Sequence, residues 1–182
     1  VKQALNNQSD DHHPLCKVKD DESNDIFTSY FKFTIVRNPF DRMVSAYHYL
    51  RARTSEGGYH ERVTKILNEK FYTFKKFVVE APWEHALPGF SKPAKRWVHF
   101  KPMIEFIDVE GGYQIDYIAR MENLQQDFDY ICDKIKWPRE QLPVRNESKH
   151  KHYTEYYDDV TRELVTKRYA RDIEHFGYKF GE

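Results

Sequence analysis

Arg37 and Ser45, two residue types that bind phosphate and sulfate, stand eight positions apart. The planar guanidinium group of an arginine pairs its N–H groups with the oxygens of such an anion. Arg37 ends an apolar run and precedes Asn38 and Pro39, a pair typical of a helix start, where unpaired backbone N–H groups also favour an anion. Ser45 would lie about 10 Å further along that helix, within reach of an arginine side chain. The spacing therefore indicates an anion site.

The same residues also allow a purely structural interpretation. Arg37 can pair with Asp41, which would lie one helical turn away, and Ser45 can be an ordinary polar residue on the helix surface. Ion pairs of this kind are common on helices. The residues alone leave the two interpretations equally open.

Two basic stretches offer further side chains for anions. His99 and Lys101 belong to the first and would suit an anionic sugar acceptor or a nucleotide, although a solvated loop is the alternative. The second stretch contains Arg145, Ser148, Lys149, His150, Lys151 and His152. Its K-H-K-H string does not predict a metal site, because the lysines repel a cation and no acidic third ligand is implied.

The element that must position Arg37 is a strand expected from Tyr30 to Val36. Because Lys32 is its only charged residue, the strand is expected to be mostly buried on both faces, as central parallel strands are. A helix is expected to follow from Asn38 and Pro39. Its apolar stripe should face the sheet and consists of Met43, Val44, Tyr47 and Leu50.

Periodicity predicts the remaining elements. Helices are expected at about 60–70 and 73–80, before a proline-broken stretch from Ala81 to Pro102. Ile104–Val109 and Gln114–Ala119 are expected to be two strands joined by a tight turn at the glycine pair between them.

Two more helices are expected towards the carboxyl end. The first spans Glu122–Lys136, and Glu122 is interpreted as a structural carboxylate favoured by the helix dipole in the first turn, with an active-site role as the alternative. Its apolar face would consist of Leu124, Phe128, Ile131 and Ile135. The last helix spans about 158–176, and Gly177 is a natural stop.

Composition limits the function classes. The chain has 182 residues, which fit a single domain, and 29 basic residues balance 29 acidic ones. The net charge therefore does not attract the protein to nucleic acid or to a membrane surface, and any anion site must come from a local group of basic residues. Cys16 and Cys132 have neither disulfide-framework nor zinc spacing and are expected to be unrelated thiols. No apolar run is long enough to span a bilayer, and the first residue is Val1 rather than methionine.

The string I-V-R-N-P-F-D-R-M-V-S-A-Y, residues 35–47, resembles the 3′-phosphate-binding motif of the carbohydrate sulfotransferases, in the branch that includes the heparan 2-O and chondroitin enzymes and bacterial relatives. In that family the arginine and the serine eight positions later hold the 3′-phosphate of 3′-phosphoadenosine 5′-phosphosulfate. The resemblance assigns these roles to Arg37 and Ser45. It extends through residues 99–107, 115–124, 145–148 and 169–178, which resemble later blocks of the family.

The resemblance implies an α/β fold like that of the P-loop nucleotide kinases, with a short, mainly parallel sheet flanked by helices in one domain, residues 1–182. The family also uses an N-terminal strand and a P-K-T-G-G-T-like loop for the 5′-phosphosulfate, and the 182 residues contain neither. The chain is therefore expected to begin just after that loop. Whether it is active alone is left open.

The function that the resemblance implies is transfer of a sulfuryl group to a hydroxyl of a carbohydrate or similar acceptor, without a metal. His12 or His13 is the candidate general base. Ser148 and Lys149 are candidates for the nucleotide, and His99 and Lys101 for the acceptor. The alternative is a non-catalytic module that binds a nucleotide or polyanion through the 3′-phosphate half-site. Members of the family lie in the cytoplasm in bacteria and in the Golgi lumen in animals.

Overall fold

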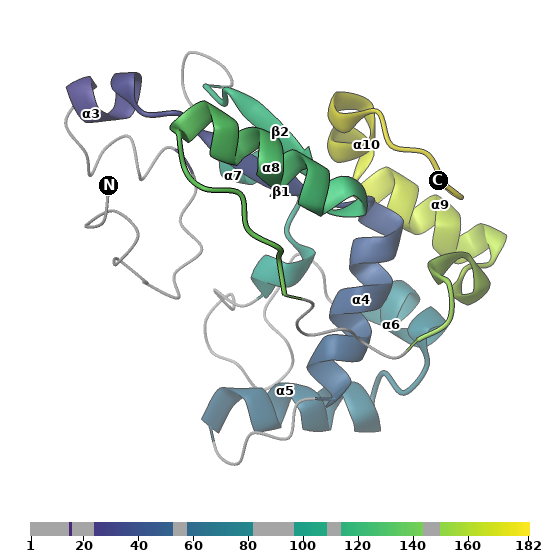
Figure 1. The fold of residues 1–182 in the computed structure, drawn as a ribbon. Helices are drawn as coiled ribbons and strands as arrows, with labels where there is room; N and C mark the ends of the chain where they lie inside the picture. The colour runs from purple at the N-terminus through teal and green to yellow at the C-terminus, as the bar shows by residue number, and fades with distance from the viewer. Residues whose placement is uncertain (1–14, 16–23, 53–57, 82–96, 109–113, 144–149) are drawn as a thin grey trace.

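The structure of the protein is a computed structural model, and it describes residue 15 and residues 24–52, 58–81, 97–108, 114–143 and 150–182. Its fold is mixed α/β and mostly helical, with a small parallel sheet (Figure 1). Strand β1 (Phe33–Val36) pairs with β2 (Tyr117–Arg120), so that Val36 lies opposite Arg120. Because the strands are parallel, their carboxyl ends meet at the same edge of the sheet.

Helix α4 (Pro39–Ala52) follows β1 directly, as predicted. The side-chain oxygen of Asn38 accepts a hydrogen bond from the N–H of Phe40 at 3.1 Å, and Pro39 fills the first helical position. The predicted apolar stripe is buried, but it does not pack on the sheet. It packs on other helices, because its residues share one core with Val63, Leu67, Phe74, Phe77 and Phe100.

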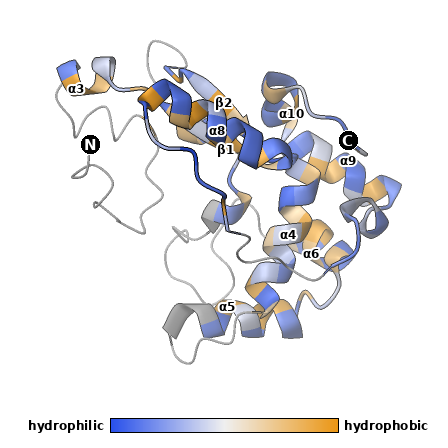
Figure 2. Ribbon diagram, viewed as in Figure 1, coloured by the Kyte–Doolittle hydropathy of each residue, from blue (hydrophilic) through white to orange (hydrophobic). Residues whose placement is uncertain are grey.

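Among the described residues, the helices around α4 form the larger of two hydrophobic cores. They are α5 (Gly58–Glu69), α6 (Phe74–Glu80), η1 (Trp97–Phe100), η3 (Tyr153–Tyr156) and α9 (Asp159–Arg168). The first two confirm the helices predicted at about 60–70 and 73–80. Figure 2 shows apolar residues gathered where α4 and α6 meet. A short helix, α3 (Asn24–Ser29), precedes the sheet.

The expected hairpin of two strands is wrong. Residues Ile104–Ile107 form helix α7, and β2 pairs with β1 instead. The reason is a contact distant in sequence: the buried carboxylate of Asp172 accepts the N–H groups of Met103 and Ile104, both at 2.8 Å, and so stabilises the start of a helical turn. A short apolar run does not by itself distinguish a strand from a buried helix.

Helix α8 (Leu124–Ile135) follows β2 through a 3-10 turn, η2 (Met121–Asn123), and lies along the sheet (Figure 1). This confirms the helix predicted at 122–136. Of its predicted apolar face Ile131 is buried, whereas Ile135 is 44 % exposed. The helix therefore covers the sheet with its middle rather than its carboxyl end.

The predicted last helix is divided in two. Helix α9 ends before Tyr169, whose backbone leaves the helical region, and α10 (Ala170–Phe176) begins after it. Tyr169 is buried, and its hydroxyl donates to the carbonyl of Phe100 at 2.7 Å, which holds the break against η1. Gly177 ends α10 with a φ of +70°, the left-handed conformation that glycine adopts at low cost, as predicted.

Strand β1 is not buried on both faces as predicted. Phe33 and Ile35, which point to one face, are 43 % and 49 % exposed, while Val36 on the other face is buried. Among the described residues the sheet has only these two strands. Helices α7 and α10 pack on the Val36 face, while α8 packs on the other face over β2, where Tyr117 meets Tyr130, so Phe33 and Ile35 of β1 stay partly exposed. In that part of the chain no helix is long and apolar enough to cross a bilayer.

Candidate functional site

The side chains of Arg37 and Ser45 meet at the start of α4. Arg37 Nη1 donates to Ser45 Oγ at 2.9 Å, and Arg37 Nε donates to Asp41 Oδ2 at 2.7 Å. The guanidinium group thus lies along the first two turns of the helix, and its side chain is 28 % exposed. The structure brings Arg37 and Ser45 together as the spacing predicts, and it also contains the ion pair with Asp41.

The donors at this site suit a phosphate or sulfate. Among the described residues Arg37 Nη2 has no acceptor, and the Ser45 hydroxyl beside Nη1 can turn its proton outward. An anion in front of these groups would accept charge-assisted hydrogen bonds from a guanidinium already held in place. Asp41 orients the guanidinium through Nε but adds a negative charge.

The backbone that carries Arg37 is held by residues distant in sequence. The N–H of Arg37 donates to Met103 Sδ at 3.4 Å, and the N–H of Asn38 donates to Glu122 Oε1 at 2.7 Å. The side-chain amide of Asn38 donates to the carbonyl of Lys179 at 2.9 Å. Glu122, interpreted from sequence as a first-turn carboxylate, instead reaches the end of the neighbouring strand. Its position just after β2, at the carboxyl edge of the sheet, could have indicated that it contacts the neighbouring strand.

The first turn of α4 also carries Arg42, whose guanidinium lies near Asp172 of α10. Arg42 Nη1 donates to the carbonyl of Lys101 at 2.6 Å. Burial lowers the pKa of Arg42, while the neighbouring Asp172 acts in the opposite direction. Burial likewise raises the pKa of Asp172, although two backbone N–H groups and Arg42 favour its charged form.

His99 and Lys101 lie beside α4, but their side chains are engaged elsewhere. The ring of His99 meets Tyr49 edge-on at 5.7 Å. The Lys101 ammonium pairs with Glu105 at 3.3 Å and lies over the ring of Phe106. The structure does not bring these two residues into contact with Arg37 or Ser45.

Other candidate residues fall outside the described part of the chain. They are His12, His13, Ser148 and Lys149, together with Cys16. Cys132 is described and is buried with a free thiol, whose pKa is raised by burial.

A cluster of aromatic rings lies one helical turn beyond Ser45. The ring of His48 stacks on His150 at 5.3 Å and meets Tyr156 edge-on at 5.0 Å. Burial lowers the pKa of His48, and the nearby His150 and Arg51 lower it further, so that His48 is neutral at pH 7. Sequence reasoning missed His48, although its position three residues after Ser45 places it on the same side of the helix.

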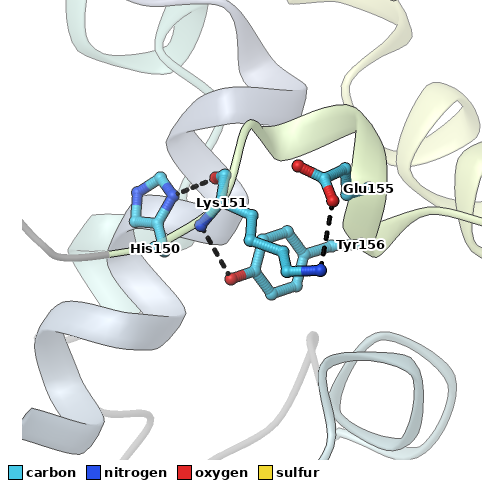
Figure 3. Close-up of a pocket in the computed structure, with 4 residues that line it drawn as sticks. All are labelled: His150, Lys151, Glu155 and Tyr156. Carbon is cyan, nitrogen blue, oxygen red and sulfur yellow. Dashed lines mark hydrogen bonds and ion pairs between the residues drawn. The ribbon is translucent and has the colours of Figure 1, made fainter.

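An open pocket of about 680 Å³ adjoins this cluster and is lined by His150, Lys151, Glu155 and Tyr156. Figure 3 shows the Lys151 side chain extending toward Glu155, and the two groups pair at 3.2 Å. The N–H of Lys151 donates to the hydroxyl of Tyr156 at 3.2 Å. The ion pair joins the lysine and the glutamate of the pocket lining. In the residues that the structure describes, no group of three or more histidine, cysteine or acidic side chains is placed to hold a metal ion.

Comparison with known proteins gives consistent matches. The sequence model described as "Sulfotransferase family" matches residues 1–179. Carbohydrate sulfotransferase 10 of Gallus gallus is 23 % identical over 186 residues, which cover 91 % of this chain and 51 % of the relative. The Homo sapiens protein of the same name is 24 % identical with the same coverage, and the Mus musculus protein is 22 % identical over 83 % of the chain and 48 % of the relative. The chain thus spans about half the length of these relatives. No solved structure matches it.

Proposed function

The chain belongs to the sulfotransferase family, and from that premise we propose that it binds 3′-phosphoadenosine 5′-phosphosulfate and serves the transfer of its sulfuryl group to a carbohydrate hydroxyl. Arg37 and Ser45 hold the 3′-phosphate in this proposal. The observation that carries it is the 2.9 Å contact between Arg37 Nη1 and Ser45 Oγ, which directs two anion-binding groups to one place.

The proposed fold is the P-loop nucleotide-kinase-like arrangement in a single domain. Its support is that β1 and β2 are parallel and that their carboxyl ends meet at the turn carrying Arg37. In open parallel sheets, ligands bind outside the carboxyl ends of the strands. The Arg37 turn therefore lies where a nucleotide is expected.

In the proposed reaction a bond forms between the acceptor oxygen and the sulfur, the sulfur–oxygen bond to the 5′-phosphate breaks, and a base takes the acceptor proton. His12 or His13 is proposed as that base. Ser148 and Lys149 are proposed to contact the nucleotide, and His99 and Lys101 the acceptor. Arg37 and Ser45 act by fixing the nucleotide, so that the donor and the acceptor are in line.

The relatives bear the name of a carbohydrate sulfotransferase and come from animals. We therefore propose a carbohydrate acceptor and, of the two compartments that the resemblance allows, the Golgi lumen.

Calorimetric titration with adenosine 3′,5′-bisphosphate and with adenosine 5′-monophosphate tests the proposal, because the two nucleotides differ only in the 3′-phosphate. Arg37→Ala should remove the preference for the bisphosphate, and Ser45→Ala should reduce it about tenfold, as expected for one hydrogen bond to a charged group. Arg139→Ala is the matched control, because Arg139 forms an exposed ion pair with Asp133 after α8.

The proposal is contradicted if Arg37→Ala keeps the wild-type preference for the bisphosphate. It is also contradicted if both nucleotides bind weakly while a sulfated polysaccharide binds with a steep dependence on salt. That outcome would indicate a polyanion-binding module instead.

A further inference from the structure

The carboxylate of Glu122 connects three parts of the chain at the carboxyl edge of the sheet. Glu122 lies in η2, directly after β2, and its Oε1 accepts the N–H of Asn38 at 2.7 Å. This N–H belongs to the peptide that joins Arg37 to Asn38. The hydrogen bond thus fixes the peptide from which the guanidinium of the anion site extends.

The second oxygen of Glu122 is held by the carboxyl-terminal segment. The hydroxyl of Tyr178 donates to Oε2 at 3.1 Å. Tyr178 is buried, and the guanidinium of Arg120 lies 4.7 Å from its ring while donating to the carbonyl of Phe176. Burial, followed by the charge of Glu122, raises the pKa of Tyr178 far above its ordinary value, so the hydroxyl remains a donor at physiological pH.

Lys179, the residue after Tyr178, also holds the turn between β1 and α4. Its carbonyl accepts a hydrogen bond from the side-chain amide of Asn38 at 2.9 Å. Asn38 is 1 % exposed, so its polar groups depend on these protein partners. The turn between β1 and α4 is therefore fixed by residues that lie 84 and 141 positions away in the sequence.

Glu122 cannot act by attracting the phosphate directly, because both groups are negatively charged. A carboxylate near a phosphate site is repulsive, and Glu122 does not cap its own helix, because η2 has no side-chain cap bond and the carboxylate reaches Asn38. What it supplies is an acceptor in a fixed place for one backbone donor. Orientation of a binding group, rather than binding itself, is what such a contact provides.

We propose that Glu122 is a positioning residue for the Arg37 site: its carboxylate, held by Tyr178, fixes the Arg37–Asn38 peptide so that the guanidinium and the Ser45 hydroxyl converge on one phosphate. The inference rests on the proposed function. It adds that the carboxyl-terminal segment is part of the nucleotide-binding structure, although neither Glu122 nor Tyr178 touches the ligand.

Asp127 provides an internal control, because its carboxylate also accepts one backbone N–H and one tyrosine hydroxyl. It takes the N–H of Arg120 at 2.5 Å and the hydroxyl of Tyr117 at 2.7 Å. Both bonds join β2 to α8, and neither donor belongs to the Arg37–Asn38 turn. Asp127→Ala therefore loses the same types of bond as Glu122→Ala without loosening Arg37.

The experiment measures the ratio of dissociation constants for adenosine 5′-monophosphate and adenosine 3′,5′-bisphosphate, together with Tm, for each variant. Glu122→Ala should lower the ratio about tenfold, and Tyr178→Phe about threefold. Glu122→Gln should stay within about threefold of wild type, because the amide oxygen can still accept the Asn38 N–H. Asp127→Ala should lower Tm while leaving the ratio unchanged.

Two outcomes overturn the inference while leaving the proposed function intact: a wild-type ratio in Glu122→Ala, or an equal loss in Asp127→Ala, which would indicate general loosening. If Glu122→Ala does not fold, a wild-type ratio in Tyr178→Phe overturns it in the same way. Failure of the proposed function is recognised separately, because Arg37→Ala would then leave the ratio unchanged.

Discussion

Asp41 acts on the guanidinium of Arg37 in two opposing ways. Its carboxylate accepts the Nε–H at 2.7 Å and so orients the group, but its charge also lies close to where a phosphate would bind. The pair is partly exposed, so solvent screens the charge more than it weakens the orienting hydrogen bond. Orientation should therefore be the larger effect.

Two substitutions of Asp41 separate these effects. Asp41→Ala removes both and should weaken binding of adenosine 3′,5′-bisphosphate about fivefold, because the guanidinium loses its fixed orientation. Asp41→Asn keeps an acceptor and removes the charge, and it should bind within about threefold of wild type. Titration calorimetry at low and moderate salt measures both. Tighter binding by Asp41→Ala would show that the charge dominates.

Helical spacing predicted that Arg37 could reach Ser45, but the sequence did not predict the bond from Asn38 to Glu122, and one difference explains both outcomes. The first contact is local, so helical spacing and the length of an arginine side chain predict it. The bond from Asn38 to Glu122 spans 84 residues and depends on which strand lies beside β1. Because the sequence pattern indicated a hairpin at 104–119, β2 was expected beside a different neighbour.

Among the secondary-structure elements, those with a long apolar periodicity formed as predicted. Helices α4, α5, α6 and α8 each run for about two turns or more with an apolar stripe, which a strand does not accommodate. The elements that differ depend on one contact with a distant part of the chain. Asp172 stabilises the start of α7, and Tyr169 separates α9 from α10 by bonding to η1.

The Tyr169 hydroxyl should contribute measurably to the free energy of unfolding. Tyr169→Phe removes the 2.7 Å bond to the Phe100 carbonyl in a fully packed region and should lower the free energy of unfolding by about 1–2 kcal/mol. Urea unfolding followed by circular dichroism measures the loss. Tyr72→Phe is the control, because Tyr72 is 57 % exposed and should change stability little. Equal stability of the two variants would contradict the role of Tyr169 in joining α9 and α10 to η1.

For the molecule as a whole, His48 should control stability in mild acid. Its folded-state pKa lies below the unfolded value of about 6.5, because of burial first and then the electrostatic interactions with His150 and Arg51. The unfolded chain therefore binds the proton more readily. Stability is fully present above about pH 6.5 and decreases as the pH falls through the unfolded pKa.

Thermal unfolding at pH 7.5 and 5.5 tests this expectation. The wild-type Tm should fall by a few degrees between the two values, and His48→Phe, which keeps a ring against Tyr156, should reduce that fall. His152→Asn serves as the comparison, because His152 is exposed and should leave the wild-type slope in place. A slope that is equally steep in His48→Phe would assign the acid sensitivity to other groups.

The bond between Asn38 and Lys179 has a consequence for synthesis. The ribosome makes Arg37 and Ser45 before Lys179, and the turn that carries them is complete only after Lys179, 141 positions beyond Asn38, has emerged and docked. Contacts of such separation form late, since loop closure must precede them. A nascent chain that has already folded α4 would thus bind the nucleotide poorly. Under the proposed function, nucleotide binding would therefore begin only after α10 and the residues that follow it have docked.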